Sequence, residues 1–131
     1  MTTLENALAL KARMKAGEVV LGSWMDLTDP CVGEIMGGIG FEWILIDTEH
    51  GPIDIPTLQT MLIGLKGSSA VPIVRVPWND QVIIKRTLDV GAYGLVVPLV
   101  KTAEDVRNAV SYAKYPPMGI RGCAPRRASD Y

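Results

Sequence analysis

The residues best suited to chemistry stand directly after apolar runs of the sequence. One group is Asp47-Thr48-Glu49-His50-Gly51, which follows Trp43-Ile44-Leu45-Ile46. His50 is the sole histidine. An unperturbed imidazole has a pKa of about 6.5, so it gains and loses a proton easily at neutral pH. The acidic neighbours and the position after an apolar run favour a general base over a solvent-exposed loop histidine.

Arg75 interrupts a second apolar run, Val71-Pro72-Ile73-Val74-Arg75-Val76. A guanidinium in such a setting needs an anion to offset its desolvation. Two interpretations stand: a structural ion pair with Asp47 or Glu49, or a bidentate grip on the carboxylate or enolate of a ligand. The two acidic residues could be acids, metal ligands or partners of Arg75. We expect them to point to opposite sides of the chain, so that only one faces the site.

Two further residues have a role that spacing alone leaves open. Asp89 falls in the last turn of an expected helix, where its charge opposes the macrodipole, so something else should hold it. The alternative is a solvated carboxylate at a helix end. Trp24 ends an apolar run and is either a packing residue or a ligand contact.

The elements that position these residues alternate between short apolar runs and longer amphipathic ones. Asp29, followed by Pro30, caps one helix, which we expect to end among the glycines at 37, 38 and 40; Thr102 caps the last one. The predicted strands are 19–24, 43–46, 71–76 and 95–97, and the predicted helices are 4–16, from 29, 54–66, 79–90 and from 102 to the prolines at 116 and 117.

Strands that are apolar throughout indicate a parallel sheet covered by helices on both faces. Four βα units of roughly 25 residues suit either an open doubly wound sheet or a (β/α)8 barrel, and a whole barrel needs about 250 residues. Leu21-Gly22-Ser23-Trp24 is no glycine-rich phosphate-binding turn. We therefore predict an α/β TIM barrel of which about the first four βα units are present, with the polar residues at the carboxyl ends of the strands.

Composition narrows the class of partner. The chain has 131 residues, 48% of them hydrophobic, and 13 basic against 14 acidic residues, which predicts one globular domain without a footprint for nucleic acid or an anionic membrane. Cys31 and Cys123 lack the spacing of a metal or redox pair, and residues 1–17 lack the apolar core of a signal peptide. These features favour a cytoplasmic protein with a small-molecule partner.

Several segments, in their order and spacing, resemble the HpcH/HpaI aldolase family. They are Leu21-Gly22-Ser23-Trp24, Gly40-Phe41-Glu42-Trp43-Ile44-Leu45-Ile46-Asp47-Thr48-Glu49-His50-Gly51, Val74-Arg75-Val76-Pro77-Trp78-Asn79-Asp80, Lys85-Arg86-Thr87-Leu88-Asp89-Val90-Gly91-Ala92, Val97-Pro98-Leu99-Val100 and Tyr115-Pro116-Pro117-Met118-Gly119-Ile120-Arg121-Gly122. The resemblance implies a TIM barrel of the phosphoenolpyruvate/pyruvate superfamily. It also implies a class II aldolase that reversibly cleaves 4-hydroxy-2-oxo acids, either diacids or sugar-derived acids, to pyruvate and an aldehyde.

The resemblance also implies roles for individual residues. His50 matches the proton acceptor, Arg75 the residue that stabilises the enolate-like transition state, and Asp89 the carboxylate that raises the basicity of the histidine. We predict substrate contacts for Arg75, Trp24 and Asp47. The family's divalent metal, here Mg, Mn or Co, is held by a glutamate and an aspartate that we expect beyond Tyr131, so we expect no metal ligand within this chain.

Residues 1–131 are thus expected to form the N-terminal half of one TIM-barrel domain, and by themselves to be inactive. Residues 126–131 carry no terminal cap or helix, so we expect a fragment of a longer protein, with a truncated product that pairs with a second half as the alternative. The family implies a homo-oligomer. Two rival functions stay open: a non-catalytic binding or assembly module, and a citrate-lyase-type enzyme acting on a coenzyme A thioester.

Overall fold

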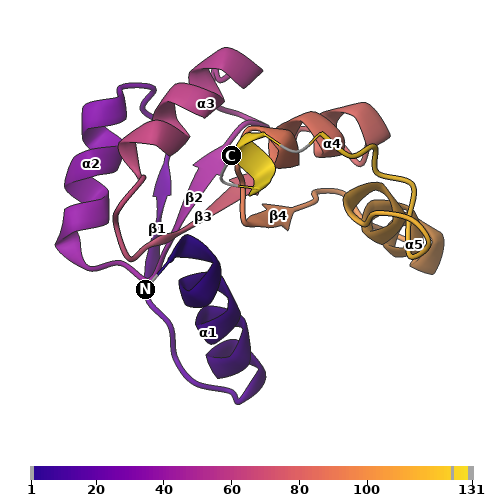
Figure 1. Ribbon diagram of the computed structural model, residues 1–131, viewed down its shortest axis with the longest axis horizontal. Coiled ribbons are helices and arrows are strands. Elements are labelled where there is room, and N and C mark those ends of the chain that lie inside the picture. Colours follow the sequence, from indigo (N-terminus) through magenta and orange to yellow (C-terminus); the bar gives the residue numbers. More distant parts are fainter. Residues whose placement is uncertain (1, 125, 130–131) are drawn as a thin grey trace.

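The computed structural model describes residues 2–124 and 126–129, which form four strands and five α-helices followed by a short 3-10 turn (Figure 1). The strands are β1 Gly22–Met25, β2 Trp43–Asp47, β3 Val71–Arg75 and β4 Gly94–Val96. The helices are α1 Thr3–Lys15, α2 Pro30–Ile39, α3 Ile55–Gly64, α4 Gln81–Asp89 and α5 Ala103–Ala113, and the turn is η1 Arg127–Ser129. Asp130 and Tyr131, at the end of the terminal segment 126–131, lie outside the described residues.

All four strands are parallel and stand in the order β1-β2-β3-β4. A parallel connection needs a crossover, and α2, α3 and α4 supply it between successive strands. This arrangement confirms the prediction of four consecutive βα units. The first strand was predicted too early, because residues 19–21 precede the sheet and Val19 is 90% exposed.

The two faces of the sheet carry different side chains, because successive residues of a strand point to opposite sides. Met25, Ile44, Ile46 and Val74 belong to one fully buried cluster that includes Leu58 of α3. The opposite face, called the inner face below, carries the other register set: Trp24, Leu45 and Ile73 in one row, and Asp47, Arg75 and Val96 in the row at the carboxyl ends. The inner face therefore ends in polar residues.

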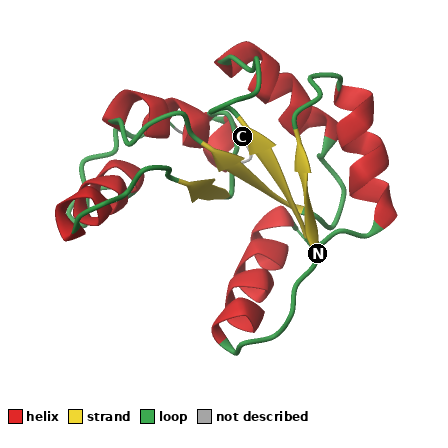
Figure 2. Ribbon diagram, turned by 180° about the vertical axis from the view of Figure 1, so that it is seen from behind, coloured by secondary structure: helices red, strands yellow, loops and turns green. Residues whose placement is uncertain are grey.

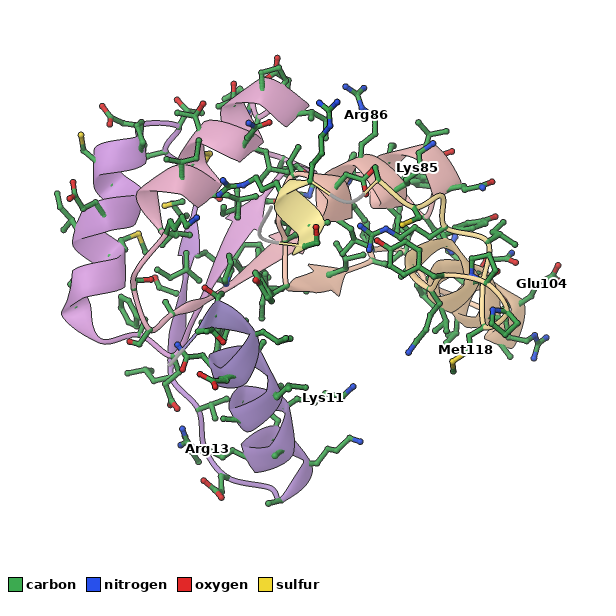
Figure 3. The ribbon with its side chains drawn as sticks, viewed as in Figure 1. Lys11, Arg13, Lys85, Arg86, Glu104 and Met118 are labelled. Atoms are coloured by element: carbon green, nitrogen blue, oxygen red, sulfur yellow. The ribbon has the colours of Figure 1, made fainter. Side chains whose placement is uncertain are left out.

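Helix α1 lies apart from the other helices, at the end of the sheet where the strands begin (Figures 1 and 2). Its residues Leu10 and Met14 line an apolar cavity of about 410 Å³ with Val71 and Ile73 of β3. Arg13, which projects from the far half of α1 (Figure 3), forms ion pairs with Glu18 and Glu42. The amino-terminal end of the inner face is thus covered by α1, whereas the carboxyl end holds the polar residues.

Short polar side chains start the helices, as predicted for two of them. Asp29 and Thr102 accept hydrogen bonds from backbone N–H groups of α2 and α5. Asp54 and Asp80 cap α3 and α4 in the same way, so these helices begin later than predicted, at 55 and 81. The hydrogen bonds that Thr57 donates to Asp54 hold the pKa of that carboxyl below its usual range.

Helices α2 and α3 pack closely because glycines leave room between their backbones. A Cβ on Gly64 would lie 2.3 Å from the carbonyl oxygen of Pro30. The prediction that α2 ends among the glycines at 37, 38 and 40 is only partly right, since Gly37 and Gly38 lie inside the helix. Gly40 ends it in the left-handed conformation, at φ 102°, that only glycine adopts without strain.

In the described part of the chain no helix has the length and apolarity that crossing a membrane requires. Cys31 and Cys123 are exposed free thiols.

Two glycine substitutions test the contact between α2 and α3. Gly64→Ala should lower the free energy of unfolding by about 1–3 kcal/mol, because the added methyl group overlaps the backbone of Pro30. Gly38→Ala is the matched control, since a Cβ there meets nothing within 4 Å, and the better helix propensity of alanine should raise stability by about 0.5–1 kcal/mol. Urea unfolding of both variants measures the difference, and equal effects would contradict the described packing.

Candidate functional site

The polar residues of the inner face meet where β2 and β3 end. Asp47 is the last residue of β2 and Arg75 the last of β3, and the sheet register places them side by side. Register partners in parallel strands face the same side of a sheet. Two residues 28 positions apart in sequence therefore form one site.

Asp47 and Arg75 form a bidentate ion pair. The guanidinium donates from Nε to Oδ1 at 2.8 Å and from Nη2 to Oδ2 at 2.6 Å. Asp47 is only 3% exposed, so the carboxylate depends on these bonds for its stability. The hydrogen bonds from Arg75 hold the pKa of Asp47 below its ordinary range, and the same contact raises the pKa of Arg75.

The turn that follows β2 is fixed by the same two residues. Oδ1 of Asp47 also accepts the backbone N–H groups of Glu49 and His50, at 3.0 and 3.4 Å. Thr48 donates its N–H and its hydroxyl to the carbonyl oxygen of Arg75, at 3.0 and 2.6 Å. The backbone from Thr48 to His50 is therefore held by both strands.

Glu49 also faces Arg75, which corrects the expectation that Asp47 and Glu49 point to opposite sides. Its Oε2 lies 3.1 Å from Nε of Arg75. Residues two positions apart in an extended chain share a side, and the turn after Asp47 brings the longer Glu49 side chain back over the strand end. Both carboxylates therefore surround one guanidinium, and the ion-pair interpretation of Arg75 describes its contacts here.

His50 lies at the rim of this cluster. Its side chain is 73% exposed, and its Nε2 lies 3.8 Å from Oε2 of Glu49. An exposed imidazole next to a carboxylate is accessible to a ligand and to proton exchange. The geometry is compatible with a general base, and the role itself stays a prediction.

Trp24, the last residue but one of β1 and not its end as predicted, covers the guanidinium. The Arg75 carbon Cζ lies 4.5 Å from the ring centroid, which is the geometry of a cation–π contact. The indole is 47% exposed. Trp24 thus contacts Arg75 and also leaves ring surface on the inner face, and its predicted contact with substrate is untested.

Asp89 lies at the last position of α4, as predicted, and its partner is an arginine. Nη2 of Arg121 donates to Oδ1 of Asp89 at 2.8 Å. Arg121 is 8% exposed and stacks over Tyr115, with Cζ 4.8 Å from the ring centroid. Asp89 is thus paired with Arg121, whereas the ring of His50 lies beside Glu49. The predicted effect of Asp89 on His50 stays a prediction.

Sequence reasoning missed Arg121. The signal was present, because a carboxylate in the last turn of a helix requires a positive partner. The partner follows α5, 32 residues away along the chain, and neither period nor spacing identifies it. The nearby glycines in Gly119-Ile120-Arg121-Gly122 indicate a constrained backbone, but they do not indicate a partner for Asp89.

A separate cleft of about 450 Å³ opens between the start of α3 and α4. Its lining includes Ile53, Pro56, Val82, Ile83 and the side chain of Arg86. None of the catalytic candidates lines it. The candidate site is therefore the open cluster on the inner face, not this cleft.

Within the described residues, no three histidine, cysteine, aspartate or glutamate side chains stand together as metal ligands do. Both oxygens of Asp47 are engaged by Arg75. Oε2 of Glu49 makes no hydrogen bond, but it lies 3.1 Å from Nε of Arg75. These side chains do not fit a complete divalent-metal site by themselves.

Comparisons with known proteins agree on one family. The family model described as HpcH/HpaI aldolase/citrate lyase matches residues 21–128. A 5-keto-4-deoxy-D-glucarate aldolase from Klebsiella pneumoniae is 46% identical over 122 residues, which cover 91% of this chain and 48% of that protein. One from Salmonella newport is 47% identical over 112 residues, covering 86% and 44%. The chain spans about half the length of these curated relatives.

Solved structures match in fold as well. The crystal structure of an HpcH/HpaI aldolase from Desulfitobacterium hafniense gives a TM-score of 0.83 at 32% identity, over 92% of this chain and 47% of that one. The citrate synthase SbnG gives 0.80 at 35% identity, over 88% and 47%. Because the matched segment contains all four strands and every residue of the cluster, the chain belongs to the HpcH/HpaI aldolase/citrate lyase family.

Proposed function

We propose that residues 1–131 form the N-terminal half of a TIM-barrel aldolase that reversibly cleaves 4-hydroxy-2-oxo acids to pyruvate and an aldehyde. The observation that carries this proposal is the cluster of Asp47, Arg75, Glu49 and His50 at the carboxyl ends of two parallel strands. Catalytic residues of TIM barrels occupy this end of the strands. The aldolases named among the relatives support the same reaction class.

Arg75 is proposed to hold the negative charge that develops on the substrate. Asp47 uses one hydrogen on Nε and one on Nη2, and a guanidinium has five N–H hydrogens in all. Three hydrogens, the two on Nη1 and the second on Nη2, are left for a ligand oxygen. Because Asp47 and Trp24 fix the edge and one face of the group, it is oriented before the substrate binds.

His50 is proposed to take the proton from the 4-hydroxyl group of the substrate. The C3–C4 bond then breaks, C4 leaves as the aldehyde carbonyl, and the electron pair remains as the enolate of pyruvate. The protonated His50 returns its proton to C3, which gives pyruvate. The exposed position of the imidazole allows such a transfer, and Asp89 is proposed to raise its basicity.

The divalent metal of the family, Mg, Mn or Co, would be bound by residues outside this chain. When bound, a divalent ion polarises a substrate carbonyl. The further strands would also pair with the edges of β1 and β4 and cover the inner face, whose Val96 and Trp24 are exposed. We propose a homo-oligomeric, cytoplasmic enzyme acting on a small 2-oxo acid and an aldehyde.

A second candidate is favoured by the similarity to a citrate synthase. It is an enzyme of the citrate-lyase type that acts on a coenzyme A thioester. Assaying pyruvate release from hydroxy-oxo acids beside cleavage of such a thioester separates the two. A non-catalytic binding module would bind oxalate, a mimic of the pyruvate enolate, without turning over either substrate.

The base assignment is tested with His50→Ala in the complete protein that contains this chain. Loss of the base should lower kcat for cleavage by about 10²–10⁴-fold. The affinity for oxalate should change little, because Arg75 remains in place. Wild-type cleavage rates in the variant would show that His50 is not the base.

The anion grip is tested with Arg75→Lys. A lysine keeps the charge but cannot form the two parallel bonds to Asp47 or stack as a plane on Trp24, so the affinity for oxalate should fall by about tenfold or more. Arg86→Lys is the matched control, since Arg86 projects from α4 beside the other cleft (Figure 3). Calorimetric titration measures both, and unchanged binding in Arg75→Lys would refute the assigned role.

The orientation of Arg75 requires an ionised Asp47, which gives a pH dependence. The pKa of Asp47 is depressed in the folded chain, so its stabilising effect is present above the ordinary aspartate value, about 3.9, and is lost as pH falls through the lower folded value. Asp47→Asn should lower the free energy of unfolding at pH 7 by about 3 kcal/mol. It should also flatten the acid side of the stability curve, and an identical slope in urea unfolding at several pH values would contradict this.

A further inference from the structure

Glu49 carries the least satisfied polar atom of the cluster. Its Oε2 is shielded from solvent and makes no hydrogen bond within the described residues. The atom nevertheless lies 3.1 Å from Nε of Arg75 and 3.8 Å from Nε2 of His50. One oxygen therefore stands between the proposed base and the proposed anion-binding group.

The hydrogen-bond count explains why this oxygen is left over. Nε of an arginine carries one hydrogen, and Arg75 donates it to Asp47 at 2.8 Å. Glu49 receives only the electrostatic attraction of the guanidinium. A shielded carboxylate oxygen without a donor is unfavourable in a folded protein. The ring nitrogen Nε2 of His50, at 3.8 Å, is close enough to be directed at it.

We propose that Glu49 is a positioning residue for the reaction proposed above, on which this inference rests. Its Oε2 restrains the exposed ring of His50 and accepts Nε2–H once the ring takes up a proton. The same negative charge lies beside Arg75 and competes with any anion bound there. Glu49 thus favours proton transfer and weakens the grip on the enolate, so that its two effects have opposite signs.

Three charged groups besides Glu49 and His50 belong to this cluster or lie near it. Asp47 pairs directly with Arg75, Asp26 acts on Arg75 through its charge, and Arg75 itself faces the Glu49 oxygen. Removing the Glu49 charge therefore leaves Arg75 still paired with Asp47. The ion pair between Asp47 and Arg75 is kept, so the substitution isolates the contribution of Glu49.

The test is Glu49→Gln in the complete, metal-loaded protein, with two measurements. The first is the exchange of pyruvate methyl protons followed by NMR, which should slow by about 10–100-fold because the base is no longer held. The second is the dissociation constant of oxalate, which should decrease by about twofold to tenfold because a competing charge is gone. A purely structural role would weaken both.

A second variant and a control complete the design. Glu49→Asp keeps the charge but lacks one methylene of reach, so oxalate binding should stay within about twofold of the wild type while proton exchange slows. Glu104→Gln makes the same chemical change on exposed α5, at the end of the molecule away from α2 and α3 (Figure 3), and should change neither measurement.

The outcomes separate this inference from the proposed function. A wild-type protein that neither binds oxalate nor exchanges pyruvate protons would overturn the proposed function. A competent wild type whose Glu49→Gln variant exchanges at the normal rate, or loses both exchange and oxalate affinity together, would overturn the role of Glu49 alone. Full exchange in Glu49→Asp would also overturn it, because reach would then be irrelevant.

Discussion

The ion pair between Asp47 and Arg75 is the interaction on which the rest of the site depends. It joins the ends of β2 and β3, and Asp47 uses one of the same oxygens to hold the backbone of the turn that carries Glu49 and His50. A buried ion pair is weak evidence for stability, because desolvation offsets most of the attraction. Its value here is geometric: one bidentate contact sets the direction of the guanidinium and the path of the following loop.

The position of this pair on the sheet explains why the site is open. The face opposite the inner face is covered by α3 and forms the buried cluster of the molecule. The inner face is covered by α1 only near the start of β3. The further strands proposed above would pair with the two open edges of the sheet, and the same addition would enclose the cluster and strengthen its electrostatics.

Local sequence signals predicted the elements well where the chemistry is local. Asp29 and Thr102 start helices because their side chains satisfy backbone groups within three residues, and the apolar runs became parallel strands. The errors have physical causes. Val19 belongs to an apolar run but lies outside the sheet, because hydrophobicity does not define where strand pairing begins. Gly37 stays helical because its backbone packs against Ser68 and Leu65, just after α3, which outweighs its low propensity, and the helix continues through Gly38 to Ile39.

The candidate site was predictable as a set of residues, not as a set of contacts. Asp89 illustrates the limit, because its unfavourable place at a helix end indicated that something else should hold it but did not identify the partner. The structure supplies Arg121, which bonds Oδ1 and is itself held against Tyr115. A hydrogen bond to one oxygen orients a carboxylate and leaves the lone pairs of its second oxygen available as acceptors. If Asp89 also serves His50, Arg121 therefore sets the direction of that second oxygen, and its positive charge offsets part of the negative charge that the histidine would experience.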